Sequence, residues 1–184
     1  MHQFIKLKSS RLKTLLPLSF IGVVALGGVF AWYSLGDNRG YAPDQPIPFS
    51  HKRHAGDNKI PCQYCHSDVD KSRHATIPSM NVCMNCHSVI RQDSPSIQKM
   101  KQLIEQGGSF EWVKVHDMAD FVFFNHKRHI AQGIACETCH GNVGEMVKVE
   151  QKEKFNMGFC VNCHRDNPLN PELKASTNCN TCHH

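Results

Sequence analysis

The organisation of this chain follows from one stretch, Phe49-Ser50-His51-Lys52-Arg53-His54, which continues after seven residues as Cys62-Gln63-Tyr64-Cys65-His66. Cys-x-x-Cys-His is the attachment signature of c-type haem, in which two thiols bond to the haem and the following imidazole binds its iron. His51 and His54 stand three residues apart, a spacing that puts both on one side of a helix. The stretch therefore combines a haem attachment site with candidate ligands for further iron positions.

The same arrangement returns in the second half of the chain. Phe124-Asn125-His126-Lys127-Arg128-His129 begins 75 positions after Phe49 and leads to Cys136-Glu137-Thr138-Cys139-His140. Each half also holds a second motif, Cys83-Met84-Asn85-Cys86-His87 or Cys160-Val161-Asn162-Cys163-His164. The pattern predicts a duplicated two-haem module. A fifth motif, Cys179-Asn180-Thr181-Cys182-His183, closes the chain.

The motifs predict five covalently bound haem c groups. They use all ten cysteines: Cys62, Cys65, Cys83, Cys86, Cys136, Cys139, Cys160, Cys163, Cys179 and Cys182. Zinc sites, redox dithiols and disulfide scaffolds also use paired cysteines, but none of them needs a histidine directly after the second one. That histidine is present every time and supplies the proximal iron ligands His66, His87, His140, His164 and His183.

The sixth iron positions need further donors. The predicted distal ligands are His51, His54, His116, His126 and His129, and weaker candidates are Met157, Met80, His74 and His184. Surface or packed histidines remain the alternative for these imidazoles. Methionine is usually a packing residue, but as an iron ligand it raises the haem potential.

The amino-terminal part predicts a membrane anchor. Residues 1–14 form a basic flank without acids, and residues 15–35 are uncharged and largely apolar. Those 21 residues span about 31 Å as a helix, enough to cross a bilayer. A cleaved signal peptide is the alternative, although its apolar region would be shorter. With the basic flank in the cytoplasm, the haem domain lies on the periplasmic, outer side of a bacterial cytoplasmic membrane.

The remaining chain divides by its motifs. We predict a Gly- and Pro-rich linker at 36–48, modules at 49–92 and 121–166, a connector at 93–120 and a fifth-haem tail at 167–184. Within the connector, Ser94-Pro95 predicts a helix start and Gly107-Gly108 its end. We expect its apolar stripe to pack on a porphyrin. With about 30 residues per haem, the predicted fold is a mainly helical and irregular multihaem cytochrome c with a haem-filled core and short helices.

The charge balance does not point to nucleic acid. The chain carries a formal charge of +5, of which the flank supplies +4 through Lys6, Lys8, Arg11 and Lys13. The haem-bearing part is therefore close to neutral before ten haem propionates are added.

The paired histidines resemble the small class III cytochromes of the c7 and c3 type. This resemblance implies that His51 serves the haem on Cys62 and Cys65, and that His126 serves the haem on Cys136 and Cys139. It further implies that His54 and His129 reach other haems.

The whole layout resembles the pentahaem cytochrome subunit of bacterial alternative complex III. The resemblance rests on the anchor and on four segments: 49–51, 77–84 (Ile77-Pro78-Ser79-Met80-Asn81-Val82-Cys83-Met84), 112–126 (from Trp112 to His126) and 157–160. It implies menaquinol oxidation in a membrane complex with iron–sulfur and polytopic quinol-binding subunits. Electrons would then leave to a cytochrome c or a terminal oxidase.

Two other functions stay open from sequence. One is a stand-alone, membrane-anchored quinol dehydrogenase feeding periplasmic reductases. The other is a multihaem oxyanion reductase, which needs an open iron position although this chain has enough imidazoles to fill all five. We expect an electron-transfer subunit with no catalytic site of its own.

Overall fold

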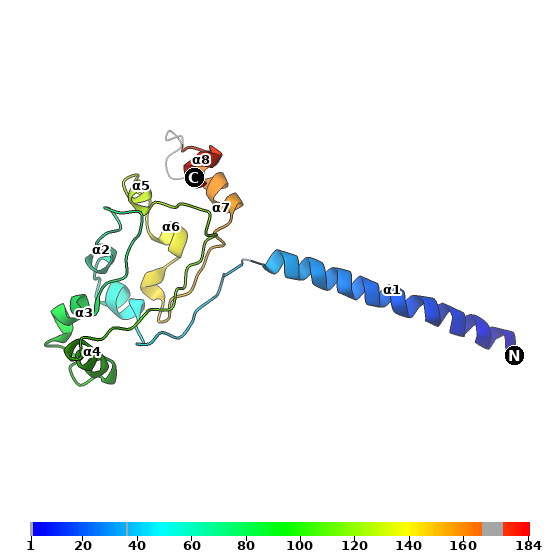
Figure 1. Cartoon of the computed structure of the whole chain (residues 1–184), viewed down its shortest axis with the longest axis horizontal. Helices are drawn as coiled ribbons and strands as arrows, with labels where there is room; N and C mark the ends of the chain where they lie inside the picture. The colour runs from blue at the N-terminus through cyan, green and yellow to red at the C-terminus, as the bar shows by residue number, and fades with distance from the viewer. Residues whose placement is uncertain (1, 36, 167–174) are drawn as a thin grey trace. The chain divides into compact units, whose positions relative to one another are not determined.

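The computed structural model describes residues 2–35, 37–166 and 175–184 (Figure 1). Residues 1, 36 and 167–174 lie outside this description, and with them the start of the predicted fifth-haem tail. The chain divides into two compact units, one ending at Asp37 and one covering Asn38–His184. The predicted division between an anchor and a haem-bearing part therefore falls at the end of the first helix.

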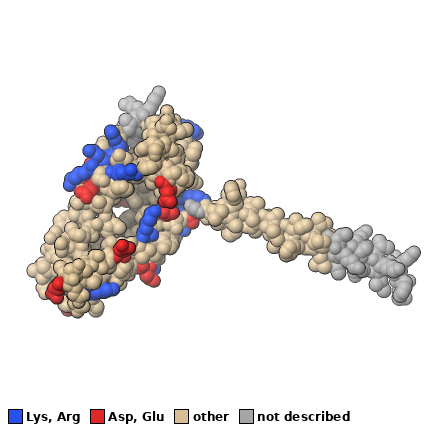
Figure 2. Space-filling view, in the orientation of Figure 1, with Lys and Arg blue, Asp and Glu red and all other residues tan. Residues whose placement is uncertain are grey.

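The first unit is a single helix, α1 (His2–Ser34), of 33 residues. Its segment Leu15–Ser34 is long and apolar enough to cross a membrane, with a mean hydropathy of 2.1 and no buried residues within its unit. Figure 2 shows no charged side chain along this segment. The helix also contains the backbone of the basic flank, because nothing in residues 2–14 breaks it. The anchor segment is thus a candidate membrane helix within a longer one.

The second unit consists of short helices joined by irregular segments, and its described residues form no β-strand. Its elements are η1, a π-helix (Lys52–Asp57), α2 (Cys62–Cys65), α3 (Met80–His87), α4 (Pro95–Glu105), α5 (His126–Ile130), α6 (Glu137–His140), η2, a 3-10 turn (Val143–Glu145), α7 (Met157–Asp166) and α8 (Cys179–Cys182). The helices α2, α3, α6, α7 and α8 carry the five motifs. This agrees with the expected mainly helical and irregular class.

The apolar core of the second unit is small. Its buried hydrophobic residues within the described part are Ile47, Val69, Ile97, Met100 and Met146. Ile97 and Met100 lie on α4, which begins with Pro95 after Ser94 and ends before Gly107 at φ +65°, as the sequence predicted. Their partners are protein side chains, Ile47 together with Met80, Cys83, Phe110 and Trp112. The expectation that this stripe packs on a porphyrin is not met, because the predicted linker and connector close over it.

The predicted linker is irregular but packs into the haem-bearing unit rather than hanging free. Gln151 is the most buried polar residue of the described chain, at 1% exposure. Its side-chain oxygen accepts hydrogen bonds from Asn38 Nδ2 (3.2 Å) and the Asp117 N–H (2.7 Å), and its Nε2 donates to the Glu153 carbonyl (2.8 Å). Its own backbone N–H and C=O pair with Tyr41 and Gly40. Gln151 therefore ties three separate segments together.

The two modules interlock through a close backbone approach. Gly56 of η1 lies against the carbonyl of Gly144 in η2, so closely that a side chain at position 56 would clash with the Gly144 oxygen. The Lys52 N–H donates to the Met146 carbonyl at 2.9 Å beside this contact. A glycine is required there because only a residue without Cβ permits the approach.

Replacing Gln151 by alanine should destabilise the loaded domain by about 2–4 kcal/mol, because buried donors and acceptors on three segments lose their partners. The matched control is Gln45→Ala. Gln45 also bonds the connector through both amide atoms, with Val113 at 2.8 and 3.0 Å, but lies where water can replace it. Urea unfolding followed by haem absorbance measures both. Equal losses for the two variants would contradict the assignment of Gln151 as the central tie.

Candidate haem centres

Each motif places its two cysteines one helical turn apart, so both thiols lie on the same side of the helix. Burial raises the pKa of the Cys65, Cys83, Cys139 and Cys160 thiols. These groups are therefore half-buried attachment points inside the unit. Side-chain clusters of His, Cys, Asp and Glu able to hold a bare metal ion are absent from the described residues.

The motifs adjoin one another in a definite order. After burial, the largest influence on the Cys65 pKa is the Cys86 thiol, which raises it further. Cys62 acts in the same way on Cys136, Cys163 on Cys139, and Cys182 on Cys160. The motifs therefore form a row: second, first, third, fourth, fifth. Figure 1 shows the same succession of α3, α2, α6, α7 and α8 across the unit.

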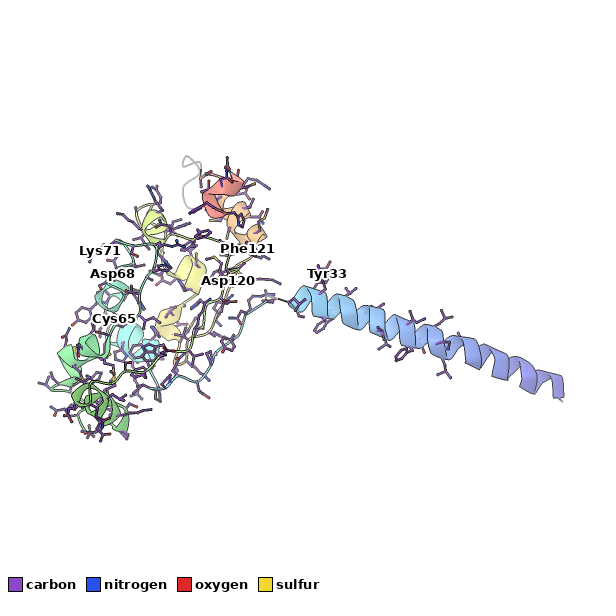
Figure 3. The ribbon with its side chains drawn as sticks, viewed as in Figure 1. Tyr33, Cys65, Asp68, Lys71, Asp120 and Phe121 are labelled. Atoms are coloured by element: carbon purple, nitrogen blue, oxygen red, sulfur yellow. The ribbon has the colours of Figure 1, made fainter. Side chains whose placement is uncertain are left out.

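Four of the proximal histidines are oriented by backbone carbonyls. The Nδ1–H of each donates to a carbonyl oxygen: His66 to Thr76 (2.7 Å), His87 to Ile90 (3.1 Å), His164 to Ser176 (2.7 Å) and His183 to Phe121 (3.0 Å). This bond leaves Nε2 deprotonated and free, which is the arrangement that metal-bound histidines use. Figure 3 labels Phe121, at the end of the row opposite the labelled Cys65.

Three of the predicted distal histidines have the same arrangement. Nδ1 of His54 donates to the Ser50 carbonyl and Nδ1 of His129 to the Asn125 carbonyl, each at 2.8 Å. Nδ1 of His126 donates across the modules to the Arg73 carbonyl at 2.9 Å. The duplicated Phe-x-His-x-x-His unit therefore prepares its second histidine locally, while a loop of the first module orients the first histidine of the second.

Proximal and distal rings face each other at the separation that one iron requires. An iron held between two imidazoles separates the ring centres by about 6 Å, since each metal–nitrogen bond is about 2 Å and each ring centre lies about 1 Å behind its nitrogen. The structure gives 6.2 Å for His54 and His87, 6.0 Å for His129 and His164, and 6.4 Å for His126 and His140. These residues fit bis-histidine ligation of the second, fourth and third haems.

His51 completes the pattern at the first motif. Its Nδ1 is buried without a hydrogen-bond partner. Burial and then the neighbouring His66 lower its pKa to about 4, so both rings lie close together and His51 is neutral at pH 7. A neutral, buried imidazole beside the proximal ligand is what an iron position between them needs.

A phenylalanine sets the paired rings in both modules. Phe49 stacks on His54 (4.4 Å between ring centres) and meets His51 edge-on at 86°. Phe124 stacks on His129 (4.3 Å) and meets His126 edge-on at 89°. The duplication seen in the sequence is therefore also a duplication of side-chain geometry.

His116 lies elsewhere than a fifth distal ligand would. Its ring contacts His140 edge-on at 4.5 Å, too close for an iron between them, and Phe155 at 6.2 Å. Its Nε2 is buried without a partner, and burial lowers its pKa. No contact within the described residues joins it to His183. A ligand role for His116 stays a prediction, and this geometry does not assign it to the fifth haem.

The weaker candidates have distinct surroundings. Met80 packs on the Ile97 cluster, whereas Met157 is 73% exposed. His74 is exposed, and His184 is exposed and stacks on Phe123 at 4.5 Å. None of the four lies opposite a proximal histidine in the ring contacts of the described residues.

Residues 122–184 match the family of cytochrome c7 and related cytochrome c. The chain is also 29% identical over 186 residues to the menaquinone reductase multihaem cytochrome c subunit of Nitratidesulfovibrio vulgaris, covering 89% of this chain and 88% of that protein. The chain is a multihaem c-type cytochrome. The match to the c7 family covers the second module and the fifth motif, and it implies covalently bound haem c there.

The cytochrome contains site residues that the motifs did not reveal. The Arg73 carbonyl orients His126, and the Gln151 side chain and Asn38 hold both neighbours of His116 through Asp117 and Val115. Backbone carbonyls have no sequence signal, since every residue has one. Gln151 stands in a polar stretch where burial is not expected.

His54→Ala should leave the second haem attached but convert it to the high-spin form, because Cys83, Cys86 and His87 remain while the opposite imidazole is lost. Absorbance and EPR spectra of the purified variant measure this change. His184→Ala is the control and should keep the wild-type spectrum of the second haem. An unchanged spin state in His54→Ala would contradict the pairing of His54 with His87.

Proposed function

We propose that this cytochrome is a membrane-anchored pentahaem subunit that relays electrons between the menaquinone pool and a redox partner on the outer side of the membrane. The observation that carries the proposal is the row of five adjoining motifs along one small unit. A row of attachment sites serves conduction over a distance, whereas a catalytic haem needs only one.

The residues that would hold the cofactors are the ten motif cysteines and the facing histidines. Haem c supplies one-electron transfer when bound. The chain orients the imidazoles through carbonyl hydrogen bonds and Phe49 or Phe124, and it keeps His51 and His140 neutral by burial. Bis-histidine ligation of most haems leaves little room for an oxyanion substrate, which argues against the reductase alternative.

The two ends of the row would be the points of electron entry and exit. The second motif, on α3, lies beside α4, and the fifth, on α8, is held by the 121–123 segment, where the Phe123 N–H donates to the Cys182 carbonyl at 2.8 Å. The third motif lies in the middle of the row. Electrons would therefore cross all five sites between two separate surfaces.

Quinone chemistry would belong to partner subunits. Oxidation or reduction of a quinone moves two protons, which normally needs titratable groups beside the ring. Residues 15–35 contain no Asp, Glu, His, Lys or Arg, although an ionisable residue in the membrane is the usual mark of such a site. The partners we propose are polytopic quinone-binding and iron–sulfur subunits, with the basic flank of this chain in the cytoplasm.

The direction of electron flow separates two candidates. The layout resembling alternative complex III implies menaquinol oxidation, with electrons leaving to a cytochrome c or a terminal oxidase. The name of the Nitratidesulfovibrio relative implies menaquinone reduction. A row of haem sites conducts both ways, so the partner subunits and the haem potentials set the direction.

The intact mass of the denatured chain should equal the apoprotein plus five haems. Each motif has both thiols and its histidine, so no site lacks an attachment group. A Cys179→Ser/Cys182→Ser double variant should lose one haem and keep four. Fewer than five haems in the unmodified protein, or bound zinc, would contradict the proposal.

The isolated subunit should be reduced by a menaquinol analogue far more slowly than the same subunit within its native membrane complex. Rapid mixing followed by haem absorbance gives both initial rates, and dithionite reduction of each sample controls for haem content. Equal rates would favour the stand-alone quinol dehydrogenase. Mixing the reduced complex with a menaquinone analogue tests the opposite direction in the same instrument.

A further inference from the structure

The duplicated modules differ at one position that precedes the second motif of each. Met80 stands three residues before Cys83, and Met157 stands three residues before Cys160. Each methionine is the first residue of its helix, α3 or α7. Because residues three apart lie on one side of a helix, each methionine shares a face with the first thiol of its motif.

In the first module that face is covered by protein. Met80 and Cys83 both pack against the cluster of Ile47, Ile97 and Met100, which α4 supplies in part. Met80 is therefore an ordinary packing residue, which is the common role of methionine.

In the second module the same face looks toward the fifth motif. Burial raises the pKa of the Cys160 thiol, and the Cys182 thiol of the fifth motif raises it further, so the two motifs adjoin on this side. Met157 is 73% exposed and has no apolar cluster over it. The place that α4 and its cluster occupy in the first module thus corresponds to the place of the fifth haem in the second.

The fifth motif has its proximal ligand prepared but no imidazole opposite it. Nδ1 of His183 donates to the Phe121 carbonyl, which leaves Nε2 for the iron. His116, the expected donor, lies against His140. His184 is the chain neighbour of His183, and two consecutive residues, with Cα atoms about 3.8 Å apart, cannot reach opposite faces of one haem.

We propose that the Met157 thioether is the sixth ligand of the fifth haem, which makes this terminal haem a His/Met site in a chain otherwise ligated by histidine pairs. The assignment rests on the five-haem loading proposed above. A methionine ligand raises the potential of its haem relative to a second histidine. The fifth haem is then the most oxidising site of the row, and electrons collect at the α8 end.

Three variants test the assignment in the full-length, haem-loaded protein. Met157→Ala should keep five haems by intact mass, convert one of the five from low-spin to high-spin, and remove the highest-potential step from a redox titration. Met157→His should restore five low-spin haems with that step moved to lower potential. Met80→Ala is the matched control, since it removes the same side chain from the same motif position and should leave spin states and potentials unchanged.

The outcomes separate this assignment from the five-haem proposal. A wild-type mass below five haems counts against the loading itself. With five haems present, unchanged spectra and potentials in Met157→Ala would overturn the ligand assignment, and so would the same spectral loss in Met80→Ala. Loss of haem from Met157→Ala alone would be resolved by Met157→His, whose five low-spin haems support the ligand role and whose wild-type potentials contradict it.

Discussion

The hydrogen bond from a histidine Nδ1 to a backbone carbonyl is the interaction on which the sites of this cytochrome depend. It occurs at His66, His87, His126, His164 and His183, and within the paired units at His54 and His129. Each bond selects the tautomer whose Nε2 can bind iron and holds the ring plane. Since a domain this small has little apolar core, irregular backbone placed beside each imidazole performs the orienting role that rigid elements perform in larger proteins.

Duplication explains the regular part of the structure, and its exceptions explain the rest. Phe49 and Phe124 set their histidine pairs in almost identical geometry. The modules then diverge after their second motifs. The first continues into α4 and a small protein core, whereas the second continues into a fifth haem motif. The close approach of Gly56 to Gly144 and the hydrogen bonds of Gln151 hold the halves against each other. The result is one row of sites rather than two separate pairs.

The distribution of charge fits a protein that conducts electrons rather than one that binds a polyanion. Figure 2 shows basic and acidic side chains interspersed on the visible face of the haem-bearing unit. Some form ion pairs, such as Lys148 with Asp44 at 2.8 Å and Lys52 with Asp57 at 2.7 Å. Exposed pairs of this kind contribute little to stability, about 0–1 kcal/mol each. The stability of the unit therefore rests on its buried hydrogen bonds and on the bound haems.

The sequence by itself determined the attachment chemistry, the duplication, the apolar first helix and the helix at 95–105, because each depends on residue types at short, regular spacing. It also identified His51, His54, His126 and His129 as the histidines to watch. Only the tertiary structure decided which rings face each other, that residues 38–48 pack into the domain, that His116 lies beside His140, and that the motifs follow the order second, first, third, fourth, fifth. These features depend on backbone carbonyls such as that of Arg73 and on contacts between residues more than 50 positions apart, such as Arg73 with His126 and Asp117 and Asn38 with Gln151. Local spacing carries no record of such contacts, because they arise only when separate segments pack together.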